Sequence, residues 1–116
     1  MSTQRTAARA VAKYLPMSAQ KVRLVIDAVR GMKVDDALDY LKFMPQRAAK
    51  PVRKVIKSAA ANAEDALDLP PSQLTISEIC AEEGPTRKWR RFGARGRFKP
   101  IKRRSSHIRV TLSPNA

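Results

Sequence analysis

The sequence predicts a protein of the α/β (α+β) class, in which helices and antiparallel strands form one domain and a basic β-hairpin projects from it. Two apolar patterns predict the domain: helical stripes in the first half of the 116-residue chain, and strand-like alternation near its end. The third observation is a run of basic residues between two strand-like segments, which predicts the hairpin. A chain of this length fits a single domain.

The first predicted elements are a short strand at residues 10–12 and a helix that follows Pro16. Ser18 is a good N-cap for this helix. Apolar residues then recur at helical spacing, which gives one buried stripe. The stripe consists of Val22, Val25, Ile26 and Val29. Gly31 is expected to end the helix, with the cation of Arg30 near its negative end.

A second, shorter helix is predicted to begin at Asp35 as its N-cap and to stop before Pro45. Val34 is expected to pack over its start. Leu38 and Leu41 supply a narrow apolar stripe, so we expect only one side of this helix to be buried.

The third predicted helix runs from about residue 47 to about residue 67. Its buried side is rich in alanine, which lets another element approach closely, and consists of Ala48, Val52, Val55, Ile56, Ala59, Ala63 and Leu67. The opposite side of its first half carries Arg47, Lys50, Arg53, Lys54 and Lys57. These cations indicate either a face of the helix that is exposed to solvent or a face that contacts phosphates. Pro51 implies that the regular helix begins later than this pattern or that it is kinked.

Two strands are predicted in the second half of the chain. Residues 74–81, after a loop at residues 69–72, are rich in β-forming residues but alternate imperfectly. Near the end, Ile108, Val110 and Leu112 alternate cleanly with polar residues. Because both segments flank the basic run, the simplest geometry is one antiparallel hairpin with the charge at its tip.

The basic run between Gly84 and Arg109 holds eleven cations and no acidic residue. The formal net charge is +14, yet the other ninety positions hold 13 basic and 10 acidic side chains. Like charges at this density repel one another unless a polyanion neutralises them, which predicts a nucleic acid partner. Eight of the eleven cations are arginines, which favour bidentate phosphate contacts. Trp89 and Phe92 suit stacking on unpaired bases.

We expect a single domain with a globular body at about residues 1–82 and 105–116 and an extended hairpin at about residues 83–104. An arm of about thirteen residues rises about 43 Å at roughly 3.3 Å per residue. A body of about 85 residues has a diameter of roughly 30 Å, so the hairpin reaches beyond it. Because an isolated ribbon is marginal in water and this one repels itself, we expect the partner to order it.

The residues predict no catalytic site, cofactor, metal or small-molecule substrate. One cysteine, Cys80, and one histidine, His107, are too few for a zinc site or an internal disulfide. The carboxylates of Asp35, Asp36 and Asp39 are expected to cap a helix and face solvent. The N-terminus lacks the apolar block of a secretory signal and no segment is long enough to span a bilayer, so we expect a cytoplasmic protein without a membrane partner.

Six segments occur in the same order as in one known family. They are residues 18–23, 30–31, 59–64, 83–86, 94–97 and 102–108, which read SAQKVR, RG, AAANAE, EGPT, ARGR and KRRSSHI. Over roughly residues 8–113 the chain resembles the large-subunit ribosomal protein family numbered twenty-two, in its bacterial form. The resemblance implies three helices packed on a small antiparallel sheet, with a long protruding basic β-hairpin. It implies a structural constituent of the large ribosomal subunit, which binds and bridges rRNA segments during assembly.

Charge and resemblance together give the expected RNA-binding residues. Those expected from charge are Arg9, Lys13, Arg87, Lys88, Arg90, Arg91 and Lys99. The resemblance implies RNA contact or hairpin support for Lys21, Arg23, Arg95, Gly96, Arg97, Lys102, Arg103, Arg104, Ser106 and His107. It implies a tip that lines the peptide exit tunnel, formed by Lys88, Trp89, Arg90, Arg91, Phe92, Gly93 and Ala94. The implied partners are large-subunit ribosomal RNA, neighbouring large-subunit proteins and the nascent polypeptide.

Two other functions stay open on the residues alone. Architectural proteins that bend DNA also use basic β-arms, usually as dimers with two arms. A preference for duplex DNA over structured RNA would favour that function. The other is an enzyme acting on RNA, although the basic region holds no acid–base or metal constellation. Turnover of RNA that is lost in His107→Ala would favour it.

Deletion of residues 87–97 is expected to leave the body folded, because the helical stripes and the strand alternation lie outside this segment. Far-UV circular dichroism and thermal unfolding check this, with the full-length chain as the control. A deletion variant without a cooperative transition would contradict the division into body and arm.

Overall fold

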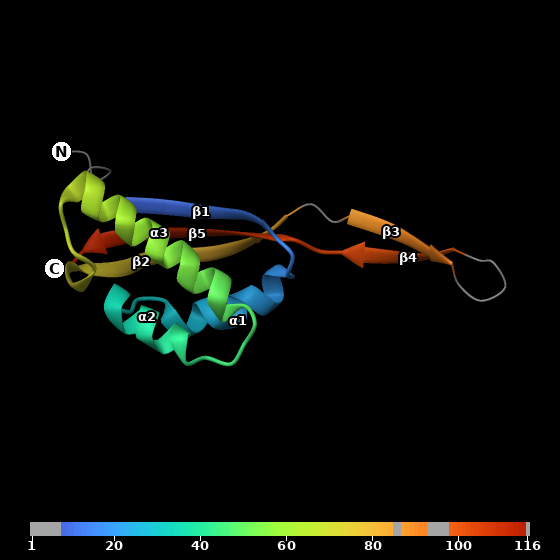
Figure 1. The fold of residues 1–116 in the computed structure, drawn as a ribbon, viewed down its shortest axis with the longest axis horizontal. Helices are drawn as coiled ribbons and strands as arrows, with labels where there is room; N and C mark the ends of the chain where they lie inside the picture. The colour runs from blue at the N-terminus through green and yellow to red at the C-terminus, as the bar shows by residue number, and fades with distance from the viewer. Residues whose placement is uncertain (1–7, 85–86, 93–97, 116) are drawn as a thin grey trace.

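A computed structural model describes residues 8–84, 87–92 and 98–115 (Figure 1). Along the chain the elements are β1 (Ala8–Leu15), α1 (Ala19–Val29), α2 (Val34–Lys42), α3 (Ala49–Leu67), a 3₁₀ turn (Pro71–Gln73), β2 (Leu74–Glu83), β3 (Arg87–Phe92), β4 (Phe98–Arg103) and β5 (Ser106–Pro114). The three helices pack against an antiparallel sheet from which a hairpin extends. The predicted fold class is confirmed.

The body is organised around β5, the central strand of a sheet with the order β1–β5–β2. Both neighbours run antiparallel to it. The side chains of Ile108, Val110 and Leu112 are buried and their sequence neighbours are not, as the alternation predicts. On β1, Ala10 lies opposite Val110 and Ala12 opposite Ile108. The predicted strand at residues 10–12 is thus the centre of a longer one, and its small side chains let a helix approach.

A β-bulge explains the imperfect alternation of β2. The register against β5 shifts between Ile76 and Glu78, so Ser77 is an extra residue on this strand. Its hydroxyl donates to the carbonyl of Thr111 at 3.0 Å. Ile76 and Ile79 are both buried although they are three residues apart. Without the bulge, the period of two would place one of them on the open face.

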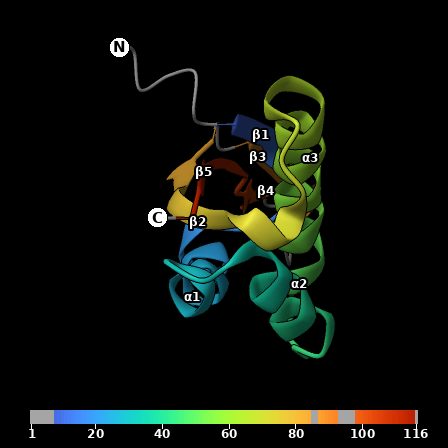
Figure 2. The ribbon, with the colours of Figure 1, turned by 90° about the vertical axis from the view of Figure 1, so that its left-hand side faces the viewer.

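The helices cover one face of the sheet, as the view along the long axis shows (Figure 2). α3 packs along β1 and β5, α1 packs on β2, and α2 packs on α3. The predicted stripe of α1 is buried throughout. The predicted stripe of α3 is buried except for Leu67, which is half-buried. Ser18 caps α1 as predicted, and Gly31 follows the helix with a φ of 82°.

The start of α2 differs from the prediction. The helix begins at Val34 with Lys33 as its N-cap, and Asp35 lies within the first turn. The physical reason is that Val34 is fully buried and therefore belongs to the packed face of the helix. Lys33 in turn is held by a β-bridge to Thr75. The carboxylate of Asp35 still lies near the positive end of the helix dipole, where it is favourable.

Pro51 fits α3 because the helix begins at Ala49, two residues later than the pattern of charges indicates. The proline is then the third helical residue, in the first turn, where its nitrogen needs no intrahelical acceptor. Of the two alternatives for Pro51, the later start is the one found. The helix ends at Asp68, which adopts a left-handed conformation with a φ of 55°.

The hairpin makes the molecule elongated. β3 pairs antiparallel with β4 and extends away from β2 and β5 (Figure 1). The extents are 63 × 32 × 19 Å, and the radius of gyration is 17.4 Å. A compact domain of this length has a radius of gyration of about 13 Å. The predicted protrusion is confirmed, while residues 93–97, which connect β3 to β4, lie outside the described residues.

Ala59→Leu is expected to destabilise the body by about 1–3 kcal/mol, because the added carbons have no space where α3 meets the sheet. Ala61→Leu is the control, since Ala61 is exposed on the same helix and undergoes the same change. Urea unfolding followed by circular dichroism measures both variants. Equal midpoints for the two would contradict close packing at Ala59.

Candidate nucleic-acid interface

The root of the hairpin, where β2 and β5 leave the body, is closely packed around Gly84. Its N–H donates to the carbonyl of Ser105 at 2.9 Å. A Cβ atom at this position would lie 2.5 Å from Ser105 Oγ and 3.2 Å from His107 Cε1. Glycine therefore allows the two strands to approach each other here, which positions the arm.

His107 joins the end of β1 to this root. Its Nδ1 accepts the backbone N–H of Tyr14 at 3.0 Å, and the two rings meet edge-on with centroids 5.0 Å apart. Tyr14 has a φ of 59°, which is uncommon for an aromatic residue, and the β1–β5 register shifts between Ala12 and Leu15. This geometry suits hairpin support, and RNA contact by His107 stays a prediction.

Ser106 is fully buried, and its Oγ has no hydrogen-bond partner among the described residues. A hydroxyl without exposed surface has no access to RNA in this conformation. Of the two roles that the resemblance implies for Ser106, hairpin support is therefore the one that the geometry allows.

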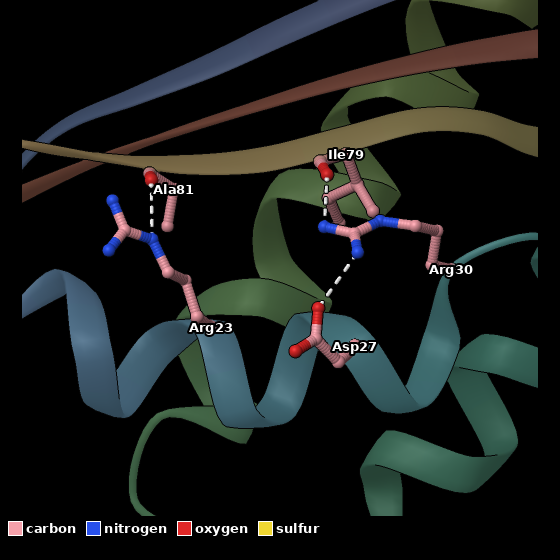
Figure 3. A network of polar contacts seen from close by, with 5 residues as sticks. All are labelled: Arg23, Asp27, Arg30, Ile79 and Ala81. Carbon is pink, nitrogen blue, oxygen red and sulfur yellow. Dashed lines mark hydrogen bonds and ion pairs between the residues drawn. The ribbon is translucent and has the colours of Figure 1, made fainter.

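Arg23 of α1 and Arg30, the residue that caps the C-terminal end of this helix, bind the outer edge of β2 (Figure 3). Arg23 Nε donates to the carbonyl of Ala81 at 3.2 Å, and Arg30 Nη2 donates to that of Ile79 at 3.1 Å. Arg30 also pairs with Asp27 at 2.8 Å. β2 is an edge strand, so its outward carbonyls need donors other than a strand. Arg23 thus has a bond within the protein, and its RNA contact stays a prediction.

Sequence reasoning missed this role of Arg30. The available signal was its spacing of seven residues from Arg23, which places both side chains on the same side of a helix. The identity of their acceptors depends on how α1 lies against β2, which no spacing along the chain gives.

The open face of the sheet carries charges of both signs. On β1, Arg9 and Lys13 are exposed, as their predicted RNA contact requires. On β5, Arg109 pairs with Glu82 at 2.6 Å and lies 3.6 Å from Cys80 Sγ. The hydrogen bond to Cys80, with the charges of Cys80 and Glu82, raises the pKa of Arg109 above its ordinary value. Arg109 thus belongs to the basic run in sequence but is neutralised within the body.

Cations gather around a hollow of about 630 Å³ at the hairpin root. It is lined by two residues predicted to bind RNA, Lys21 of α1 and Arg104 between β4 and β5. Arg47, from the segment that leads into α3, joins them, and no acidic residue is among the described residues that line the hollow. The sequence left the role of Arg47 open because its distance from the other two cations depends on the fold.

The charges of α3 are arranged against its dipole. Lys50, Lys54 and Lys57 are exposed in its first half, whereas Glu64 and Asp65 are exposed near its end. Helices are stabilised by anions near the N-terminus and cations near the C-terminus, so this order costs stability. The basic end lies nearer the hairpin than the acidic end (Figure 1). An external anion at the basic end would offset that cost, which favours the phosphate-contacting interpretation of this side of α3.

The register of the hairpin places basic residues opposite one another. Arg87 is paired with Arg103, Lys88 with Lys102, and Arg91 with Lys99. Like charges at directly opposite positions destabilise a sheet, which favours binding to a polyanion. Arg90 lies opposite Pro100. Of the predicted site residues, Gly93, Ala94, Arg95, Gly96 and Arg97 lie outside the described residues.

Neither a metal-binding cluster nor a membrane-spanning helix occurs in residues 8–84, 87–92 and 98–115. Among these residues, no group of three or more His, Cys, Asp or Glu side chains is arranged to hold a metal ion. No helix in this part of the chain is both long enough and apolar enough to cross a membrane.

Two comparisons with known proteins show the family of this chain. The sequence profile of the family described as Ribosomal protein L22p/L17e matches residues 10–113. A curated relative, the large ribosomal subunit protein uL22 of Pediococcus pentosaceus, is 47% identical over 113 residues, which cover 97% of this chain and 96% of the relative. Both matches span the body and the hairpin. The chain therefore belongs to the ribosomal protein L22p/L17e family.

Proposed function

We propose that the chain is a structural constituent of the large ribosomal subunit, which binds large-subunit rRNA in the cytoplasm. The observation that carries this proposal is the cationic surface at the hairpin root, where Lys21, Arg47 and Arg104 line one hollow and the other described lining residues are uncharged. Family membership and the name of the relative as a large-subunit protein support it. The family is one of ribosomal structural proteins, and we propose no catalytic activity.

In this proposal the body and the arm bind different RNA segments and bridge them during assembly. Phosphates that approach one another repel, and the cations between them lower that repulsion. The body supplies a rigid base because β2 and β5, which lead into the arm, lie in its packed sheet. The facing cations of β3 and β4 repel each other until phosphates neutralise them. RNA binding and ordering of the arm would thus occur together.

We further propose that the tip, at residues 88–94, lines the peptide exit tunnel and that the nascent polypeptide and neighbouring large-subunit proteins are partners. The support is the resemblance, together with the length of the arm. The molecule extends over 63 Å, about twice its second dimension of 32 Å. An arm of this length carries its tip far from the surface that the body would occupy.

A DNA-bending function has less support. Such proteins use two arms in a dimer, and their arms enter the minor groove with apolar residues that kink the duplex. The cationic surface of this chain extends instead from the arm onto the body, at Lys21 and Arg47. Membership of a ribosomal protein family also favours RNA.

Binding to large-subunit rRNA is expected to weaken steeply with salt. If about six cations contact phosphates, the logarithm of the affinity falls against that of the salt concentration with a slope of about −4 to −5. Arg104→Ala is expected to make this slope shallower by about 1, because one phosphate contact is lost. Lys42→Ala, at the end of α2, is the control with the same charge change and an unchanged slope. Fluorescence anisotropy at several potassium chloride concentrations measures these slopes.

A flat salt response of the wild-type chain would contradict the proposal. In a direct competition, preference for duplex DNA over structured rRNA would favour the architectural alternative instead.

A photoreactive residue in place of Trp89 is expected to crosslink to the nascent chain in translating ribosomes, because the tip is proposed to face the tunnel. The same residue in place of Lys42 on the body is the control and is expected to give no such product. Gel analysis of a radiolabelled nascent chain measures both. Crosslinks from position 89 to rRNA alone would contradict the tunnel-facing tip.

A further inference from the structure

We propose that the hollow at the hairpin root is a binding site for one unpaired nucleotide of the RNA. The base would lie on its apolar wall, and the adjoining phosphate would lie between its three cations. This inference rests on the proposed function, because it specifies which feature of the RNA the body would take.

The size and the construction of the hollow fit such a ligand. Its volume of about 630 Å³ falls within the range of about 300–1,000 Å³ that is usual for small-molecule sites. Its walls come from segments that are distant in sequence: the turn before α1, α1 itself, the segment that leads into α3, and Arg104 next to β5. The hollow is open on one side, so a base can enter while its strand remains outside.

The apolar wall is formed by Pro16, Met17 and Leu24. Leu24 is 71% exposed, although the other large apolar residues of α1 are buried in the core. A single exposed leucine is ordinary on a protein surface. Here, however, it adjoins two further apolar side chains in the same hollow, which together offer a surface for the flat face of a base. Covering that surface would remove apolar area from water, which is favourable.

The charges beside this wall match a phosphodiester. Lys21, Arg47 and Arg104 are the charged residues among the described lining of the hollow, so the charge of an incoming phosphate would meet cations there. Arginine suits phosphate because its guanidinium binds two oxygens at once. Gln46, which also lines the hollow, has an amide that donates and accepts hydrogen bonds, as the polar edge of a base requires.

An acidic peptide with an apolar side chain has a related chemistry, but the surroundings favour RNA. Beyond the hollow, exposed lysines continue along the first half of α3 at positions 50, 54 and 57. On the other side, Arg104 is continuous with the basic run of the hairpin. A phosphodiester chain that passes the hollow would find cations before and after the inserted nucleotide, whereas a peptide would need acidic residues along its whole length.

The bound nucleotide would also connect parts of the protein that are distant in sequence. It would touch α1, the segment that leads into α3 and the hairpin root at the same time. RNA binding would therefore hold the arm in one direction relative to the helices, in addition to neutralising its charge.

The test compares Leu24→Asp with Ala28→Asp. Both residues are exposed on α1, one helical turn apart, and Ala28 does not line the hollow. Base-specific chemical probing of large-subunit rRNA, with and without each protein, is the measurement. We expect the wild-type chain and Ala28→Asp to protect the same unpaired nucleotide, and Leu24→Asp to lose that protection while other protections remain. The affinity of Leu24→Asp should fall about tenfold, because apolar contact is lost and a carboxylate faces the phosphate.

A second pair tests the phosphate contact. Arg47→Glu is expected to lose the same protection, and Arg47→Lys to retain it, because a cation remains in place. Circular dichroism and thermal unfolding check that all variants are folded.

If Leu24→Asp and Arg47→Glu protect the same nucleotides as the wild-type chain, the inference is wrong and the proposed function stands. If acidic peptides protect the hollow from solvent labelling and rRNA does not, the inference is also wrong. If the wild-type chain protects no nucleotide at all, the proposed function fails as well.

Discussion

Burial of one face of β5 beneath the helices is the interaction on which the rest of the molecule depends. Ile108, Val110 and Leu112 lie in a single apolar core with α1 and α3, and β5 bonds to a strand on each side. The same strand leads directly from the arm, through Arg104, into the core. Because β2 is anchored in the same sheet, both strands of the arm begin from fixed positions. The direction of a charged, self-repelling hairpin is thus set by hydrophobic packing in the body.

The hydrogen bonds that protect the outer edge of β2 also hold α1 in place against the sheet. β2 has a strand partner in the sheet on one side only, and on its other side Arg23 of α1 and Arg30 at the C-cap of α1 donate to its carbonyls. These bonds satisfy an edge that would otherwise be open to another chain. They also fix α1 relative to the sheet, and α1 supplies Lys21 and Leu24 to the hollow at the root. Two arginines that do not line the hollow therefore help to position two residues that do.

Charge in this chain is separated in space as well as in sequence. The acidic residues of α3 lie at the end away from the hairpin, and its basic residues lie toward it. Within the basic run itself, Arg109 is paired with Glu82 on the open face, whereas Arg104 lines the hollow. Two arginines of the same basic run thus have different roles: one forms an ion pair within the protein, and the other lines the hollow. An electrostatic surface of this kind attracts a polyanion more strongly to the end of the body near the hairpin than to the end that carries Glu64 and Asp65.

The sequence alone determined the helices, the alternating strand and the location of the hairpin, because their signals are local periodicities and a local run of charge. The sequence also indicated the family, because the motifs of the hairpin and of α1 are short, continuous segments. It placed the N-cap of α2 two residues late, because burial of Val34 depends on a neighbour distant in sequence. The bulge at Ser77 was visible only as an irregular pattern, since register is a property of paired strands.

Only the tertiary structure decided which cations act together. Lys21, Arg47 and Arg104 are separated by 26 and 57 residues along the chain, yet they line one hollow. Likewise, only the packing shows that Ser106 is buried and that His107 accepts a bond from Tyr14. A pattern of residue types gives the charge and the apolar face of each element, because these depend on near neighbours. The assembly of a site from several elements depends on how the core brings their faces together.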